Sequence, residues 1–285
     1  MIAMFRNLNP RTILGIKNLK FRYDIICRLA REAKFDGIDI DPLFLDDNSV
    51  ENAKKSIFKY RLRVGGWSLP AKWRTRSDSE FDQIKDKISR AAAIASRLSC
   101  FRAYTWIEPF SDDMNYNTNF QWHIERLREV ARILMKESCL LGLEYVAPMT
   151  ARVGHPFIFI HTMKEMIELI GEMKMKNVGL LLDSFHWYAA KENRRDILEL
   201  DKKQIIYVHI NDAPNVPIDE LRDDERCLPG ETGVIDIDGF FYGLRELEYD
   251  GPITPETFNS GSVDMGMSDA IFTAGKALYK VWPRN

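Results

Sequence analysis

Short apolar runs alternate with longer amphipathic, charge-rich stretches along the chain. The short runs have the length and the β-branched residues of buried strands, whereas the longer stretches repeat apolar residues at helical spacing. This pattern predicts strands over residues 12–16, 37–41, 62–67, 100–104, 141–146, 178–183, 205–210 and 251–256. It predicts helices over residues 24–34, 50–60, 81–98, 120–140, 163–175, 194–200, 238–247 and 268–281.

The regular alternation of strand and helix predicts a parallel sheet built from βαβ units. A chain of 285 residues with eight such units has about the size of a closed (β/α)8 barrel, which typically needs about 250 residues. We therefore expect an α/β protein that forms a single (β/α)8 TIM barrel, with an open doubly wound sheet as the structural alternative. Because no Pro-, Ser- or Gly-rich linker divides the sequence, we expect one domain over residues 1–285.

The charge and cysteine composition argue against a nucleic acid partner and against a disulfide or zinc framework. Lys and Arg total 40 against 42 Asp and Glu, which gives a net charge of −2, so no basic excess is present to bind a nucleic acid backbone. Four cysteines lie far apart and form no C-x-x-C pair, which favours a reducing, cytoplasmic location over a disulfide framework or zinc knuckle. No apolar run reaches the length of a signal-peptide core or of a membrane span, so we expect no membrane association.

The last four predicted strands each end on a residue that can bind a metal ion. Because the carboxyl ends of barrel strands form the active-site face, we expect these side chains to converge. Three carboxylates and one imidazole suit one divalent ion such as Mn²⁺, Mg²⁺, Co²⁺ or Zn²⁺. Without a cation, repulsion among the carboxylates should leave at least one of them protonated. The predicted ligands are Glu144 in LLGLE, Asp183 in VGLLLD, His209 in IIYVH and Glu256 in PITPE.

A set of motifs around these residues resembles the xylose-isomerase-like TIM-barrel superfamily of sugar phosphate isomerases and epimerases. The motifs are GLEYVAP around Glu144, LLDSFHWY with Asp183 and His186, YVHINDAP with His209, RCLPGETGVIDI from Arg226, and YDGPITPETF with Glu256. The resemblance implies that Glu144, Asp183, His209 and Glu256 bind one divalent metal ion. It also implies that Glu144 and Glu256 move protons, that His186 and Arg226 contact substrate oxygens, and that the chain forms a homodimer.

Other residues near the predicted mouth have two interpretations. Arg226 lies in a long loop over residues 213–235, where it can hold a substrate oxyanion or form a surface ion pair with its acidic neighbours. Trp67, Trp106 and Trp187 lie at or just after strand ends, where each can pack against a sugar or belong to the core. The motifs depart from the family pattern at Asn211, where several members carry Lys.

The expected reaction is isomerisation or epimerisation of a sugar or sugar phosphate. A metal ion that binds a substrate carbonyl and its neighbouring hydroxyl makes the adjacent C–H acidic and stabilises the enediolate that follows. One alternative is a dehydratase of the same superfamily that acts on a keto-cyclitol or a dehydroshikimate-like acid. Another is a non-catalytic protein that binds a metal and a sugar. All three hypotheses imply a small carbohydrate, polyol or keto-acid as the partner.

Overall fold

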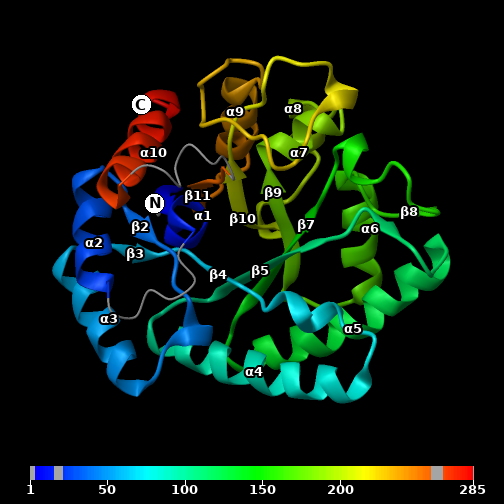
Figure 1. Cartoon of the computed structure of the whole chain (residues 1–285), viewed down its shortest axis with the longest axis horizontal. Helices are drawn as coiled ribbons and strands as arrows, with labels where there is room; N and C mark the ends of the chain where they lie inside the picture. The colour runs from blue at the N-terminus through cyan, green and yellow to red at the C-terminus, as the bar shows by residue number, and fades with distance from the viewer. Residues whose placement is uncertain (1–3, 16–21, 258–265, 285) are drawn as a thin grey trace.

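The computed structural model describes residues 4–15, 22–257 and 266–284, and its strands form one parallel ring (Figure 1). The strands follow the order β3-β2-β1-β11-β10-β9-β7-β5-β4, and each neighbouring pair is parallel. Their bounds are β1 Phe5–Leu8, β2 Gly37–Ile38, β3 Arg63–Val64, β4 Trp67–Ser68, β5 Arg102–Ile107, β7 Leu140–Tyr145, β9 Val178–Asp183, β10 Ile205–Ile210 and β11 Pro252–Pro255.

The ring closes at its third strand. β3 and β4 are two parts of one strand, which is interrupted at Gly65 and Gly66. The Gly65 amide donates to the Ile38 carbonyl oxygen at 3.0 Å, while Leu69 beyond β4 donates to the Tyr104 carbonyl oxygen at 2.9 Å. The two sides of this strand therefore bond to β2 and to β5. The prediction of a (β/α)8 barrel is confirmed.

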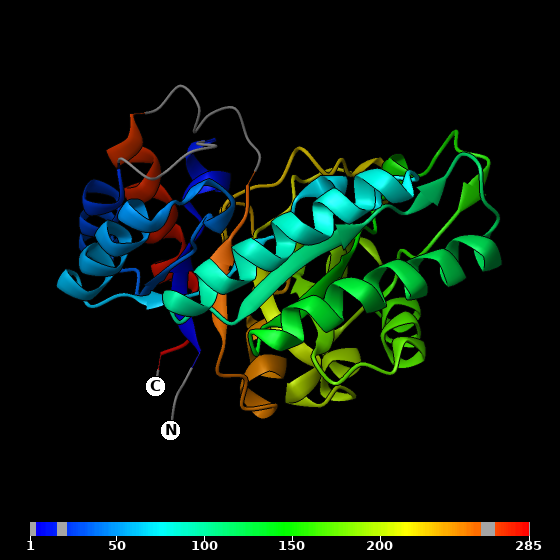
Figure 2. The same ribbon diagram turned by 90° about the horizontal axis from the view of Figure 1, so that it is seen from below.

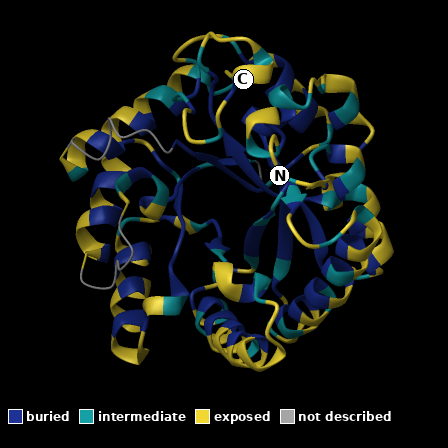
Figure 3. Ribbon diagram, turned by 45° about the vertical axis from the view of Figure 1, so that its right-hand side comes forward, coloured by how far each residue is buried: buried dark blue, intermediate teal, exposed yellow. Residues whose placement is uncertain are grey.

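Helices surround the strands on the outside (Figure 2). Their inward faces are buried and their outward faces are exposed (Figure 3), as expected for amphipathic helices on a barrel. All eight predicted helices are present with shifted ends. The helices are α2 Tyr23–Glu32, α3 Asp47–Lys59, α4 Asp78–Arg97, α5 Tyr116–Lys136, α6 Met163–Met173, α8 Arg194–Leu198, α9 Ile237–Glu246 and α10 Met267–Val281, with the short α1 Pro10–Leu14 and α7 Ser184–Ala189 in addition.

The predicted strand over residues 12–16 is wrong for the part of it that the structure describes. The first barrel strand is β1, and residues 10–14 form α1 instead. The Asn9 side chain accepts from the Arg11 and Thr12 amides, and Pro10 occupies the first turn, so the segment carries a helix start signal. Gly15 ends the helix at φ 63°, a left-handed conformation. Ile16 lies outside the described residues.

A small second sheet lies outside the ring. β6 Phe110–Ser111 pairs with β8 Phe157–Ile158 in antiparallel orientation. These strands belong to the connections that follow β5 and β7, and the hydrophobic pattern did not predict them. Among the helices of the described residues, none is both long enough and apolar enough to cross a membrane.

Candidate metal centre

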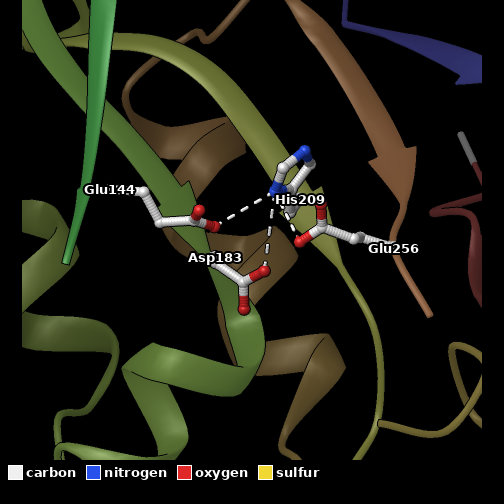
Figure 4. Close-up of side chains that lie close together, drawn as sticks. All are labelled: Glu144, Asp183, His209 and Glu256. Carbon is white, nitrogen blue, oxygen red and sulfur yellow. Dashed lines mark hydrogen bonds and ion pairs between the residues drawn. The ribbon is translucent and has the colours of Figure 1, made fainter. Parts of the chain in front are cut away.

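The four predicted ligands converge at the carboxyl ends of their strands (Figure 4). Glu144 lies near the end of β7, Asp183 ends β9, His209 lies near the end of β10 and Glu256 directly follows β11. The Nδ1 atom of His209 is 3.1 Å from Glu144 Oε1, 3.0 Å from Glu256 Oε2 and 3.7 Å from Asp183 Oδ2. All four side chains are buried. Adjacent parallel strands bring them together, since His209 pairs in register with Asp183.

The donor atoms fit a single divalent cation. One atom from each of the four residues can be chosen so that all lie within 4.8 Å of one another. Ligand atoms about 2.0–2.2 Å from one ion are at most about 4.4 Å apart, so only small side-chain shifts are needed to surround it. Three carboxylate oxygens and an imidazole nitrogen form a hard-to-borderline donor set. This buried group could therefore hold one metal ion.

The electrostatics of the metal-free cluster favour bound protons. Burial, and then the neighbouring Glu256 carboxylate, raise the pKa of Glu144 to about 7. Burial lowers the pKa of His209, but the Glu256 and Glu144 carboxylates outweigh it and hold that pKa well above its ordinary value. A cation would replace these protons, because carboxylate and neutral imidazole are the forms that bind a metal.

Arg226 reaches the same cluster from the long loop that follows β10. Its buried guanidinium donates from Nη1 to Asp183 Oδ2 at 2.8 Å and to Glu256 Oε2 at 2.6 Å, and from Nη2 to Asp223 Oδ1 at 2.7 Å. Burial raises the pKa of Asp183, but Arg226 outweighs it and the net pKa is about 2. Arg226 therefore takes part both in the site and in an ion pair with its acidic neighbour Asp223, but this pair is buried and not on the surface. Its contact with a substrate oxyanion stays a prediction.

His186 lies beside Arg226 at the start of α7. Asp183 caps this helix, because its Oδ1 atom accepts from the Phe185 amide at 2.6 Å and from the His186 amide at 3.1 Å. His186 Nε2 is 2.9 Å from Arg226 Nη2. Burial and the nearby Arg226 charge lower the pKa of His186, which favours the neutral imidazole. Asp183 thus both contributes to the donor set and positions His186.

The loop over residues 213–235 is fixed by a residue that the sequence patterns did not single out. The Asp212 carboxylate accepts from the amides of Thr232 at 3.1 Å, Gly233 at 2.7 Å and Ile235 at 2.9 Å. Its backbone also pairs with Cys227, next to Arg226. Asp212 therefore holds both ends of the loop that carries the arginine. Its place three residues after His209, directly before a long loop, was the available sequence signal.

A cavity of about 950 Å³ opens above the cluster. Its lining includes Glu144, His186, His209, Arg226 and Glu256 from the site, and Trp106, Tyr104, Phe44, Arg11 and Lys72 from the walls. Trp106 pairs in register with Glu144 on the neighbouring strand. Its indole nitrogen donates to Glu108 Oε1 at 3.3 Å, and the Arg74 guanidinium lies 4.1 Å from the ring centroid. Trp106 is thus a fixed aromatic wall beside the site.

The other two tryptophans do not line this cavity. Trp67 is fully buried and belongs to the hydrophobic core. Trp187 is buried against Phe240, and its indole nitrogen donates to the Asn193 carbonyl oxygen at 3.2 Å. Of the two interpretations that the sequence allowed, Trp67 and Trp187 therefore take the core position, which corrects their prediction as substrate-binding residues. A strand-end position does not decide which way a side chain points when the strand is interrupted or a helix begins at once.

The fold and the site together define a TIM barrel with a buried carboxylate–histidine centre at the mouth. The model of the family described as "Xylose isomerase-like TIM barrel" matches residues 27–278. This chain belongs to that family, as its motifs indicated.

Curated relatives have related names. The chain is 31% identical over 158 residues to the inosose isomerase of Bacillus subtilis (strain 168). These aligned residues cover 55% of this chain and 54% of that protein. It is 34% identical over 104 residues to the 3-dehydroshikimate dehydratase of Pseudomonas aeruginosa. This match covers 36% of this chain and 16% of that protein. It is 27% identical over 260 residues to the ketose 3-epimerase of Arthrobacter globiformis. This match covers 87% of this chain and 81% of that protein. The chain thus spans about half the length of the inosose isomerases it matches.

Solved structures share the whole architecture. A xylose isomerase domain protein from Alicyclobacillus acidocaldarius superposes with a TM-score of 0.85 at 25% identity, covering 98% of each chain. The IOLI protein, whose structure is described as having a binding zinc atom, superposes with a TM-score of 0.80 at 24% identity, again covering 98% of each chain. These likenesses confirm the barrel across nearly the entire chain.

Proposed function

We propose that this protein is a divalent-metal-dependent isomerase or epimerase that acts on a sugar or sugar derivative by proton transfer. The observation that carries the proposal is the arrangement of two buried glutamates. Glu144 and Glu256 approach His209 from opposite sides (Figure 4), at the base of a cavity large enough for a sugar. The names of the inosose isomerase and ketose 3-epimerase relatives support this class of reaction.

Each residue has a role in such a reaction. The bound cation would act as a Lewis acid on a substrate carbonyl and so increase the acidity of the neighbouring C–H group. Glu144 and Glu256 are the proton carriers, since a base on one face and an acid on the other are what epimerisation requires. Arg226 and His186 would contact a substrate oxygen where negative charge develops. Trp106 would pack against the apolar face of the substrate and exclude water.

A dehydratase is the second candidate, because the first proton abstraction is the same and a 3-dehydroshikimate dehydratase is among the relatives. Elimination of water needs an acid at the leaving hydroxyl, and His186, which lines the cavity, would have to supply it. The lowered pKa of His186 favours its neutral form, which is a poor proton donor. This observation favours isomerisation or epimerisation over elimination.

Several finer points belong to the same proposal. We propose one bound ion per chain, drawn from Mn²⁺, Mg²⁺, Co²⁺ and Zn²⁺, and the zinc in the related IOLI structure supports such a site. We also propose one domain over residues 1–285 and a small carbohydrate, polyol or keto-acid as the substrate, without a nucleic acid or membrane partner. The cytoplasmic location and the homodimer stay predictions from the sequence.

Proton exchange tests the proposal directly. Metal-free protein, reloaded with each of the four ions, is mixed with ketoses, cyclitols and keto-acids in D₂O and followed by proton NMR. We expect loss of the signal from the carbon next to the carbonyl, followed by signals of the isomer or epimer. Glu144→Gln and Glu256→Gln should abolish the exchange, whereas Glu246→Gln on the exposed face of α9 should leave it unchanged.

Other outcomes identify the alternatives. New alkene signals would indicate the dehydratase. Sugar and metal binding without any exchange would indicate a non-catalytic binding protein. Failure to bind any of the four ions after reconstitution would contradict the ligand assignment itself.

A further inference from the structure

A layer of polar side chains fills the barrel interior beneath the metal centre. It consists of Asn7, Asp39, Tyr104, Tyr207 and Thr254, and all five are buried. Tyr207 precedes His209 by two residues on β10, so both side chains point to the same, interior face of that strand. We call these five residues the tyrosine layer. A polar group in a barrel interior is costly unless it is hydrogen-bonded, so its partners are informative.

Asp39 is the centre of the tyrosine layer. Its Oδ2 atom accepts from the hydroxyl of Tyr104 at 2.8 Å and from that of Tyr207 at 2.7 Å. Its Oδ1 atom accepts from Asn7 Nδ2 at 2.7 Å and from the Gly66 amide at 2.7 Å. Each carboxylate oxygen thus has two donors, which is the pattern of an ionised carboxylate whose hydrogen bonds are satisfied. Asp39 therefore fixes the outer ends of both phenol rings.

The barrel is shaped around this layer at its interrupted third strand. A Cβ atom on Gly65 would lie 2.5 Å from Asp39 Oδ1. A Cβ atom on Gly66 would lie 2.8 Å from Tyr207 Cε2 and 3.1 Å from Tyr104 Cε1. Two successive glycines thus leave the space that Asp39 and the two rings occupy. A side chain at either glycine would therefore collide with the layer.

Both rings contact the imidazole of the metal centre. The ring centroids of Tyr104 and Tyr207 lie 5.6 and 5.4 Å from that of His209, at interplanar angles of 84° and 81°. His209 Nδ1 faces the carboxylates, whereas its buried Nε2 has no hydrogen-bond partner among the described residues. A metal-binding histidine is ordinarily oriented by a hydrogen bond from its second nitrogen. At His209 two edge-to-face ring contacts are present and that hydrogen bond is not.

We propose that Asp39 is a positioning residue that sets metal affinity through Tyr104 and Tyr207. By holding the two rings against His209, it keeps Nδ1 aimed at the three carboxylates. This inference rests on the metal centre of the proposed function, but it assigns a role to a residue that contacts neither the metal ligands nor the cavity above them.

Metal titration of the full-length, metal-free protein tests the inference, with Mn²⁺ as the probe. Asp39→Asn replaces one acceptor oxygen by a donor, so an NH2 group faces either both tyrosine hydroxyls, at the Oδ2 position, or Asn7 and the Gly66 amide, at the Oδ1 position. Tyr207→Phe keeps the ring but removes its hydroxyl. We expect each variant to weaken Mn²⁺ binding about 10- to 100-fold, the range found when partners of metal ligands are removed. If Asp39→Asn does not fold, the Mn²⁺ affinity of Tyr207→Phe alone tests the positioning role.

Tyr249→Phe is the matched control. Tyr249 is also a buried tyrosine, and its hydroxyl donates to the Pro252 carbonyl oxygen at 3.0 Å at the start of β11, the opposite end of the strand from Glu256. It should lower the thermal midpoint of the metal-free protein about as much as Tyr207→Phe and leave the Mn²⁺ dissociation constant unchanged.

Each result has a distinct meaning. Wild-type affinity in Asp39→Asn and Tyr207→Phe would overturn the positioning role. Equal weakening by Tyr249→Phe would show a general loss of order in the barrel, which also overturns it. If the wild-type protein itself binds neither Mn²⁺ nor the other three ions, the proposed function fails first, and the role of Asp39 falls with it.

Discussion

At the scale of single residues, Arg226 compensates the carboxylates of the metal-free centre. It bonds to both Asp183 and Glu256 while fully desolvated. Arg226→Met would leave these carboxylates buried without their cation, and breaking a buried pair in this way costs about 3–5 kcal/mol. We expect that loss in the free energy of unfolding of the metal-free protein, measured in urea. Saturating Mn²⁺ should restore part of it, because the ion supplies the missing positive charge.

Arg222→Met on the same loop is the control for this prediction. Arg222 pairs with Asp224 at 3.3 Å, and both side chains are more than half exposed. Exposed pairs of this kind contribute at most about 1 kcal/mol. A loss for Arg226→Met that is as small as for Arg222→Met, or that Mn²⁺ does not reduce, would contradict the compensating role.

The pKa of Glu144 gives a prediction about pH. Burial and then Glu256 raise it from 4.5 to about 7, so the carboxyl is protonated in the metal-free protein below about pH 7. That proton, and the one retained by His209, must leave when a cation binds. We expect Mn²⁺ binding to weaken at least about tenfold per unit as the pH falls from 7 to 5. Calorimetric titration in buffers of different ionisation enthalpy measures both the affinity and the protons released.

The raised pKa of Glu144 also determines whether the stability of the metal-free protein rises or falls with pH. Because the folded-state pKa of Glu144 lies above 4.5, its contribution to the stability of the metal-free protein is complete below pH 4.5 and is lost as the pH rises through 7. Bound metal should reverse this trend. A metal affinity that does not change between pH 5 and 7 would show that the cation displaces no proton from either Glu144 or His209, which contradicts the prediction.

The sequence predicted the four converging ligands better than the residues around them. Glu144, Asp183, His209 and Glu256 each end a clear apolar run, and parallel strands bring such ends together. Asp39 carries no comparable signal, because it lies inside the predicted strand over residues 37–41 and not at its end. Its role depends on Tyr104 and Tyr207, which are far away in the chain, and only the closed barrel brings the three together.

At the scale of elements, strand prediction succeeded where a six-residue run is fully buried and rich in Val, Ile and Leu. The ranges 178–183 and 205–210 agree with β9 and β10 at both ends, and every residue in these strands is buried. The strand β1, with sequence FRNL, was missed. Its interior position is taken by Asn7 of the tyrosine layer, and Arg6 forms an ion pair with Asp36. A four-residue strand with two polar residues at its centre does not show the apolar pattern on which prediction relies.

The interrupted third strand supports a prediction about stability. Gly66→Ala would place a methyl group 2.8 Å from Tyr207 Cε2 and 3.1 Å from both Tyr104 Cε1 and the Arg102 carbonyl oxygen. Overpacking of this kind costs about 1–3 kcal/mol, which urea unfolding would detect. Gly171→Ala in α6 is the control, because nothing lies within 4 Å of its added Cβ and alanine favours a helix by up to about 1 kcal/mol. Equal stability of Gly66→Ala and the wild type would mean that the layer is loosely packed.

At the scale of the whole molecule, the first and last strands of the barrel are neighbours. β1 pairs with β11 through Phe5 opposite Pro252 and Arg6 opposite Ile253. One continuous apolar core joins Leu8 near the start of the chain to Leu278 in α10. Neither half of the chain can complete the ring alone, which is the physical reason for proposing one cooperative domain.

If the barrel unfolds cooperatively, a metal ion bound at the centre should stabilise the whole barrel. We expect metal-free protein to unfold in urea in one transition, with coincident curves from tryptophan fluorescence and far-ultraviolet circular dichroism. Mn²⁺ at about 100 times its dissociation constant should raise the free energy of unfolding by about 2.7 kcal/mol, and both curves should shift together. In Glu256→Gln the shift should shrink, since one ligand is lost. If only one probe responds to the metal, part of the chain unfolds independently of the ring, and the single-domain proposal is wrong.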